Sequence, residues 1–302
     1  MKSTIKLIRV YQWIKSGFVL LPFIFSDKLY LLTVFPLQSE IYDIVIKLAL
    51  AFFGFSFMAS TVYVLNDLKD VELDRKDPRK KKRPLASGKI SVFSALVTGV
   101  ILFLSGTAFA FYLGGSLLTL FLTYFVMNVF YTYVGKRIII LDVLIIAIGY
   151  VMRVLAGAFV LNITASPWLL STTFFIALFL GFNKRFYEVN TSEAEQLIGG
   201  IYIPETLKSF TNITAALSIM NYSIYTILGS HSEANLVWTV PLVVFGFFRY
   251  YVIMQAPEEV EDGNPSDLLL SDKFLILTIV AWMILCSALI LNAAKQNPSI
   301  QF

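Results

Sequence analysis

Residues 66–91 read NDLKDVELDRKDPRKKKRPLASGKIS, an acidic stretch followed at once by a basic one. The segment comes directly after a mostly apolar run at residues 42–65, which is long enough to cross a bilayer as a helix. If that helix continues into the acidic stretch, Asp67, Asp70 and Asp74 lie on one narrow stripe, because residues three, four and seven positions apart share a helix face. The sequence therefore predicts a row of carboxylates at the end of a membrane helix.

Carboxylates this close together repel one another, so their charge is best tolerated when cations neutralise it. Magnesium binds one or two carboxylates together with phosphate oxygens and water. The acidic stripe is therefore typical of a site that holds a diphosphate through Mg²⁺. We predict that the metal is bound by side-chain oxygens of Asn66, Asp67, Asp70 and Asp74.

A basic run follows the acidic stripe, after Pro78, which we expect to end the helix. Cations that face a metal-bound diphosphate would clamp a polyanionic leaving group, and we expect Lys80 and Arg83 to bind phosphate. Taken alone, the same run is also typical of a positive anchor that touches anionic lipids. Its position next to the acidic stripe favours the phosphate clamp.

The composition of the whole chain is that of a membrane protein. Of its 302 residues, 57% are hydrophobic and only 15% are charged, whereas soluble domains carry about 25% charged residues. The apolar runs predict about nine spans in a single domain over residues 1–302, all helical because lipid offers no partner to free backbone groups. We place the spans near residues 9–26, 42–65, 92–113, 115–134, 139–161, 168–183, 211–229, 235–255 and 273–293.

Basic residues set the orientation of these spans. With the N-terminus inside, most of the 24 Lys and Arg residues lie in cytoplasmic segments, as the positive-inside rule requires. We therefore expect a multi-pass protein of the cell (inner) membrane whose motif loops, residues 66–91 and 184–210, are cytoplasmic. One cysteine, Cys286, and one histidine, His231, cannot form a disulfide or a Cys/His metal cluster. We expect no nucleic-acid partner.

The first motif resembles that of the UbiA-type intramembrane prenyltransferase superfamily, NDxxDxxxD followed by a basic segment and RPLxxGxIS. The resemblance implies an all-helical fold of nine spans around a cavity open to the cytoplasm and laterally to lipid. It also implies that Asp67, Asp70 and Asp74 are catalytic residues that work with Mg²⁺. After residues 66–74, the pattern is met here by Arg83, Pro84, Leu85, Gly88, Ile90 and Ser91.

A second site separates the branches of this superfamily. Most aromatic prenyltransferases have another aspartate-rich motif after the sixth span, but residues 181–188 read GFNKRFYE here and contain no aspartate. This basic sequence resembles the decaprenyl-phosphate phosphoribosyltransferase branch, which has a GKRxxE-like pattern at this place. Other segments similar to that branch are Arg9 with Gln12, Trp13 and Lys15, then residues 142–157, and finally Arg249, Tyr250, Pro265, Asp267 and Asp272.

This resemblance implies transfer of 5-phosphoribose from phosphoribosyl diphosphate to a polyprenyl phosphate in the membrane. Such a reaction brings two further phosphates into the site, which suits cations better than more carboxylates. Lys184 is expected to be a catalytic residue. We expect further substrate or phosphate contacts from Gln12, Lys15, Asn66, Lys80, Arg83, Lys136, Arg153, Arg185, Glu188 and Asp267.

Several alternatives stay open at this point. The aspartate motif alone also suits an aromatic prenyltransferase with a polyprenyl diphosphate donor, and a lipid carrier that binds cations is a third class. Arg153 is either functional or part of a structural ion pair, because an arginine deep in a membrane helix needs a cavity or a partner. Glu188 either binds metal or only pairs with Arg185 at a helix end, and Asp267 lies in an acidic loop typical of a solvated face. The sequence also leaves a homo-oligomer open.

Overall fold

The computed structural model describes residues 2–33, 39–77, 80–190, 202–229, 234–254 and 271–296. These residues form helices and short connections, without a strand in the described part, which agrees with the expected all-helical class. The long helices are α3 (Ser39–Lys76), α4 (Val92–Leu113), α5 (Gly115–Tyr133), α6 (Leu141–Leu161), α7 (Pro167–Asn190), α9 (Pro204–Leu228), α10 (Val240–Met254) and α12 (Lys273–Gln296).

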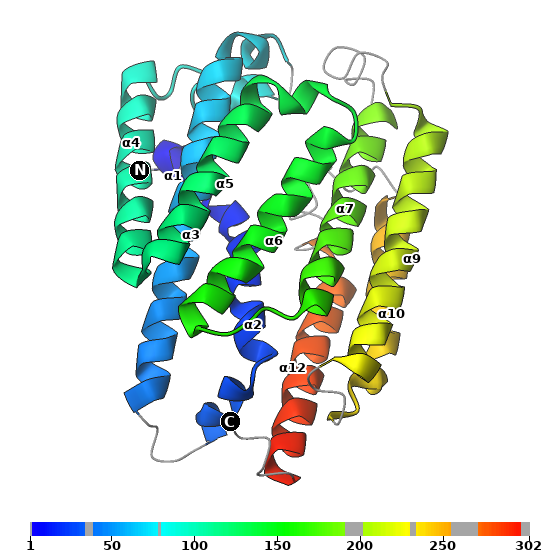
Figure 1. Ribbon diagram of the computed structural model, residues 1–302. Helices are drawn as coiled ribbons and strands as arrows, with labels where there is room; N and C mark the ends of the chain where they lie inside the picture. Colours follow the sequence, from blue (N-terminus) through cyan, green and yellow to red (C-terminus); the bar gives the residue numbers. More distant parts are fainter. Residues whose placement is uncertain are drawn as a thin grey trace.

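The long helices run alongside one another in a single bundle (Figure 1). Helix α3 packs against α4 and α5, α7 packs against α9, and α6 lies between these groups in contact with α3, α5 and α7. The C-terminal ends of α3, α5 and α7 and the start of α6 all lie at the upper end of the view in Figure 1. The two motifs found in the sequence are therefore placed at the same end of the bundle.

Within the described residues, six helices are long and apolar enough to cross a membrane, or seven spans if a bent N-terminal pair counts as one. Helices α7 and α9 reach 24 and 25 residues but do not meet this test. Each predicted span after the first overlaps one long helix. A polytopic helical membrane protein is thus confirmed, whereas the predicted count of nine spans is not.

The segment expected as the first span, residues 9–26, is helical from Val10 to Ile24, but most of it is a 3-10 helix and a break stands at each end. A short helix, α1 (Lys2–Leu7), is followed by Arg9 with a left-handed backbone at φ 52°, which a right-handed helix cannot accommodate. The chain continues as a 3-10 helix (Val10–Leu20), then α2 (Leu21–Ile24), and bends by 90° into another 3-10 helix (Asp27–Thr33). The break turns the Arg9 side chain toward the acidic stripe on α3.

Helix α3 continues without a break through the predicted membrane span and the acidic stripe, for 38 residues in all. Its neighbour α4 lies so close that a Cβ atom added to Gly106 would lie 3.0 Å from the carbonyl oxygen of Gly54. This contact fixes one face of α3 against α4. The aspartates are thereby held on a rigid element rather than on a loose loop.

Candidate functional site at the ends of α3 and α7

The aspartates of the acidic stripe face cations that come from other segments. Nη1 of Arg83 donates to Asp74 Oδ2 at 2.7 Å and lies 3.4 Å from Asp67 Oδ1. Asp67 also accepts a hydrogen bond of 2.5 Å from Nη2 of Arg9. Both aspartates are buried, so their charges are balanced mainly by these guanidinium groups. The N-terminal segment and the basic loop are thereby joined to α3.

Asp70 and Asn66 connect the same stripe to the loop after α5. Both carboxylate oxygens of Asp70 accept from Nζ of Lys136, at 2.7 and 2.8 Å. The side-chain oxygen of Asn66 accepts a hydrogen bond from the hydroxyl of Thr132 at the end of α5. Lys136, which was expected to contact substrate, is therefore brought to the acidic stripe.

The second motif is arranged around Arg185, a half-buried arginine near the end of α7. Nε of Arg185 donates to Asp142 Oδ2 at 2.7 Å, and its Nη1 donates to Glu188 Oε2 at 2.5 Å. Nζ of Lys184 lies 3.8 Å from the other carboxylate oxygen of Glu188. Glu188 thus pairs with Arg185, as one of the two alternatives expected, and also faces Lys184; metal binding by Glu188 stays a prediction.

Electrostatic interactions link the two motifs. Lys80 of the basic loop stabilises the charge of Glu188, and Arg9, which binds Asp67, acts on Lys184. Interactions between charges fade over a screening length of about 8–10 Å in physiological salt. The acidic stripe and the α7 motif lie at the same end of the bundle (Figure 1), and charges of one act on the other.

The pKa of the Lys184 ammonium group is lowered to about 8. Burial is the largest cause; the nearby cations Arg185, Lys15 and Arg9 add to it, and Glu188 opposes it. Burial would raise the pKa of Glu188, but Arg185 and Lys184 outweigh burial and lower it. Lys184 is therefore a cation that loses its proton just above neutral pH, beside a carboxylate that stays charged.

The residues at the acidic stripe suit a magnesium ion that carries a diphosphate. In the described part of the chain, no three His, Cys, Asp or Glu side chains form a ready metal cage. A Mg²⁺ ion with bound phosphate needs only one or two carboxylates, and Asp67 and Asp74 lie on either side of one Arg83 nitrogen. Carboxylate oxygens are the hard donors that Mg²⁺ prefers. This donor set fits the metal predicted from the sequence.

The remaining predicted site residues lie in different places. Gln12 is buried and Lys15 is half-buried in the N-terminal 3-10 helix. Asp267 lies outside the described residues. Arg153 is far from the acidic stripe: its guanidinium stacks on Phe55 at 4.7 Å, which precedes Asp67 by 12 residues, or about 18 Å along α3.

Arg153 has no carboxylate partner among the described residues. It donates to the carbonyl oxygen of Gly149 at 2.7 Å and to the hydroxyl of Tyr124 at 3.2 Å. Its guanidinium also lies over the rings of Tyr124 and Tyr150. The structural ion pair considered for Arg153 is thus replaced by stacking on aromatic rings. Its binding to phosphate stays a prediction.

Two residues of the site, Arg9 and Asp142, were not predicted from the sequence. Arg9 was noted only as part of a resemblance, yet it pairs with Asp67. Asp142 is 2% exposed and holds Arg185. The signal for Asp142 was present, because a lone carboxylate at the start of an apolar helix is costly to bury without a cation.

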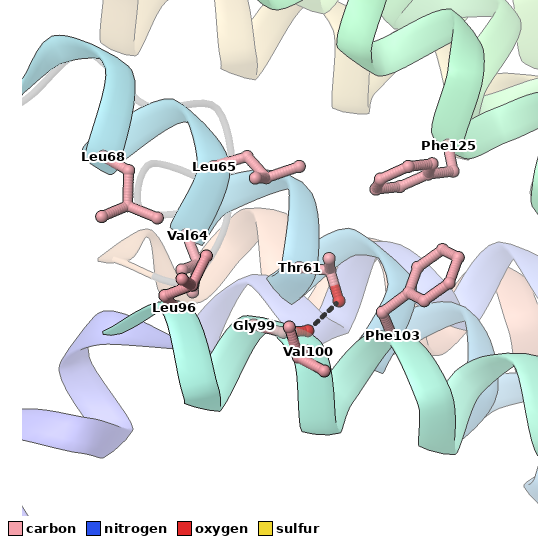
Figure 2. A pocket seen from close by; sticks show the side chains of 9 residues that line it. All are labelled: Thr61, Val64, Leu65, Leu68, Leu96, Gly99, Val100, Phe103 and Phe125. Atoms are coloured by element: carbon pink, nitrogen blue, oxygen red, sulfur yellow. Dashed lines mark hydrogen bonds between the residues drawn. The ribbon is translucent and has the colours of Figure 1, made fainter. Parts of the chain in front are cut away.

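An apolar groove of about 200 Å³ lies on a different face of α3, between α3, α4 and α5 (Figure 2). Phe103 and Phe125 stand together at one end of it, and the hydroxyl of Thr61 points to the carbonyl oxygen of Gly99. The groove residues of α3 are turned by about 140° around the helix from the aspartates. The groove is therefore separate from the charged site.

The helical membrane fold with this aspartate stripe defines a class of enzyme. The family model of the UbiA prenyltransferase family matches residues 30–266, and the chain belongs to this family. It is accordingly a multi-pass membrane transferase.

Along most of its length the chain is similar to two curated enzymes and to one solved structure. The chain is 28% identical over 293 residues to the decaprenyl-phosphate phosphoribosyltransferase of Corynebacterium glutamicum, covering 92% of this chain and 84% of the relative. It is 27% identical over 298 residues to the enzyme of the same name from Mycobacterium tuberculosis, covering 93% and 92%. The fold is similar to a UbiA homologue from Archaeoglobus fulgidus solved with GPP and Mg²⁺, with a TM-score of 0.70, 17% identity and coverage of 95% and 99%.

Proposed function

We propose that this protein transfers 5-phosphoribose from phosphoribosyl diphosphate to a polyprenyl phosphate and releases diphosphate. The observation that best supports this function is the cationic α7 motif, where Lys184 and Arg185 lie at the same end of the bundle as the acidic stripe (Figure 1). A prenyl diphosphate and an aromatic acceptor bring only one phosphorylated group, whereas the proposed pair of substrates brings three. The relatives named phosphoribosyltransferase over most of the chain support the same choice.

In this reaction the bond between ribosyl C1 and the diphosphate oxygen breaks, and a bond from C1 to an oxygen of the lipid phosphate forms. The lipid phosphate is already ionised at neutral pH, so the chain needs no strong general base. The residues of the site would therefore act by positioning the two substrates and by stabilising charge.

The acidic stripe would hold the diphosphate through the metal, with Asn66, Asp67, Asp70 and Asp74 as ligands. Mg²⁺, when bound, supplies the Lewis acid that stabilises the departing diphosphate. Arg83 and Lys136, which pair with these carboxylates in the structure, would donate to phosphate oxygens once the carboxylates serve as ligands. Lys80 lies in the same basic loop and is proposed as a further donor.

Lys184 would bind a phosphate group of either substrate as the catalytic cation of the second motif, together with Lys15 and Gln12. Arg185 and Glu188 are proposed contacts of the same region, as is Asp267. The membrane supplies the lipid substrate. We place the site on the cytoplasmic side of the cell (inner) membrane, where a soluble sugar diphosphate is available, and an oligomer of this chain is compatible with the proposal.

An aromatic prenyltransferase with a polyprenyl diphosphate donor is the second candidate. The acidic stripe favours both candidates equally, because a metal-bound diphosphate is the leaving group in each reaction. The test uses purified protein, Mg²⁺, radiolabelled phosphoribosyl diphosphate and decaprenyl or undecaprenyl phosphate. A labelled lipid is the expected product. Turnover of a prenyl diphosphate with an aromatic acceptor, without any labelled phosphoribosyl lipid, would overturn the first candidate in favour of the second.

A further inference from the structure

A buried hydrogen-bond chain connects the start of α6, the end of α7 and the segment before α9. The hydroxyl of Tyr202 donates to Asp142 Oδ1 at 2.8 Å, and Asp142 Oδ2 accepts from Arg185 Nε at 2.7 Å. Arg185 then donates to Glu188. Tyr202 and Asp142 are 6% and 2% exposed, so the bond between them is not easily replaced by water.

The same chain also fixes the backbone where α6 begins. Ile140 has φ 68°, a left-handed conformation that is costly for a β-branched residue. Its backbone N–H donates to the Tyr202 hydroxyl at 2.6 Å. Tyr202 thus holds Ile140 and Asp142 together, at the point where Asp142 must meet Arg185.

The two neighbouring cations of this hydrogen-bond chain, Arg185 and Lys184, have different partners. Arg185 is held by the two carboxylates of Asp142 and Glu188, and its Nη2 lies 3.4 Å from the hydroxyl of Tyr131. Within the described part of the chain, Lys184 pairs with one carboxylate, Glu188, at a longer distance of 3.8 Å. Asp142 balances part of the charge of Arg185. Arg185 therefore binds only one carboxylate oxygen of Glu188, and the other oxygen faces Lys184.

We propose that Asp142 and Tyr202 are positioning residues, which hold Arg185 and Glu188 so that the Lys184 ammonium group faces the phosphate-binding region. The effect of these two residues on catalysis rests on the proposed function, but their effect on the position of Lys184 does not. Without Asp142, Arg185 keeps Glu188 as its one carboxylate partner among the described residues and draws that carboxylate away from Lys184. Lys184 would then stand among Arg185, Lys15 and Arg9 with less opposing charge.

The test measures how fast an amine-acylating reagent modifies Lys184 as a function of pH, read by mass spectrometry of the purified protein. The wild-type midpoint is expected near pH 8. Asp142→Asn should lower the midpoint by about half a pH unit, Tyr202→Phe should lower it by less, and Asp142→Glu should restore it. A merely structural role would leave the midpoint of a folded variant unchanged.

Matched controls are available elsewhere in the chain. Asp43→Asn removes an exposed carboxylate that pairs only with Lys47 among the described residues, and Tyr250→Phe removes a buried hydroxyl without a hydrogen-bond partner there. Neither should move the midpoint. A folded Asp142→Asn protein, and a folded Tyr202→Phe protein, with the wild-type midpoint would overturn the proposal. If Asp142→Asn does not fold, Tyr202→Phe decides alone.

The acylation measurement needs no substrate, so it is independent of the reaction itself. In the phosphoribosyl assay, Asp142→Asn is expected to lower kcat/KM about tenfold, with partial recovery in Asp142→Glu. A lowered midpoint without phosphoribosyl transfer by the wild-type protein would keep the positioning role and reject the proposed function. If the wild-type protein transfers phosphoribose but the midpoint is unchanged in the variants, the proposed function stands and the positioning role is rejected.

Discussion

Lys136 and Asp70 are 66 positions apart in the sequence, yet Nζ of Lys136 lies within 2.8 Å of both carboxylate oxygens of Asp70. The pair joins the end of the acidic helix to the turn between α5 and α6. Both side chains are partly exposed, so a metal-bound diphosphate can reach them. A substitution of Asp70 can therefore distinguish most clearly between a role in the reaction and a role in folding.

Asp70→Asn is expected to lower the transferase rate by at least about 100-fold, because loss of one preorganised charge at a transition state typically costs this much. The thermal midpoint of unfolding should change little, since Asp70 is not buried. The rate and the melting curve are measured on the same preparation, with Asp43→Asn as the control. Near-normal turnover by Asp70→Asn would contradict the metal assignment.

Lys184→Ala is expected to lower kcat/KM for phosphoribosyl diphosphate about 10- to 100-fold, the usual range for a lost hydrogen bond to a charged group. Lys208→Ala at the start of α9 serves as the control, because Lys208 is exposed. A full rate in Lys184→Ala would remove the main support for a phosphoribosyl donor.

The pH dependence of substrate binding follows from the same lysine. Because the pKa of Lys184 is lowered to about 8, its charge is complete below this value and is lost as the pH rises through it. Affinity for phosphoribosyl diphosphate should thus fall above pH 8 in the wild type. In Lys184→Arg the guanidinium stays protonated beyond about pH 12, so binding should remain constant to pH 10 in calorimetric titrations.

Removal of divalent metal should abolish diphosphate binding. With the chelator present, the acidic stripe repels a polyanion, and Mg²⁺ reverses this by bridging carboxylate and phosphate oxygens. Binding of inorganic diphosphate is measured by calorimetry with chelator and again after Mg²⁺ is added back. Equal affinity in the two conditions would show that cationic side chains suffice.

Gly157→Ala is expected to destabilise the protein by about 1–3 kcal/mol through overpacking. An added Cβ would lie 2.0 Å from the carbonyl oxygen of Val19, so α6 and the N-terminal 3-10 helix would have to separate. The matched control is Gly115→Ala, where an added Cβ meets nothing within 4 Å. Equal melting temperatures for the two variants would refute the close approach.

The long helices were largely predictable because membrane-length apolar runs have few other structures available. The acidic stripe was predictable for the same reason, since α3 simply continues past the apolar run to Lys76. The breaks at the two ends of the N-terminal helical segment were not, because the left-handed backbone at Arg9 accompanies a tertiary contact with Asp67. Periodicity in the sequence contains no trace of that contact.

The partners of the site residues were also beyond reach of the sequence. Asp142 and Arg185 are separated by 43 positions, and only the packing of α6 on α7 brings them together. For Arg153 the pattern correctly indicated a special residue, but its aromatic surroundings come from three different helices. Burial cost predicts that such a group has partners, without saying which ones.

The unbroken length of α3 has a consequence for how the enzyme responds to its bilayer. Its 38 residues measure about 57 Å, whereas the hydrocarbon core is about 30 Å thick. A thicker or thinner membrane would tilt the helix as a whole rather than bend it between its apolar part and Asp67. The height of the acidic stripe above the lipid tails is thus expected to follow bilayer thickness.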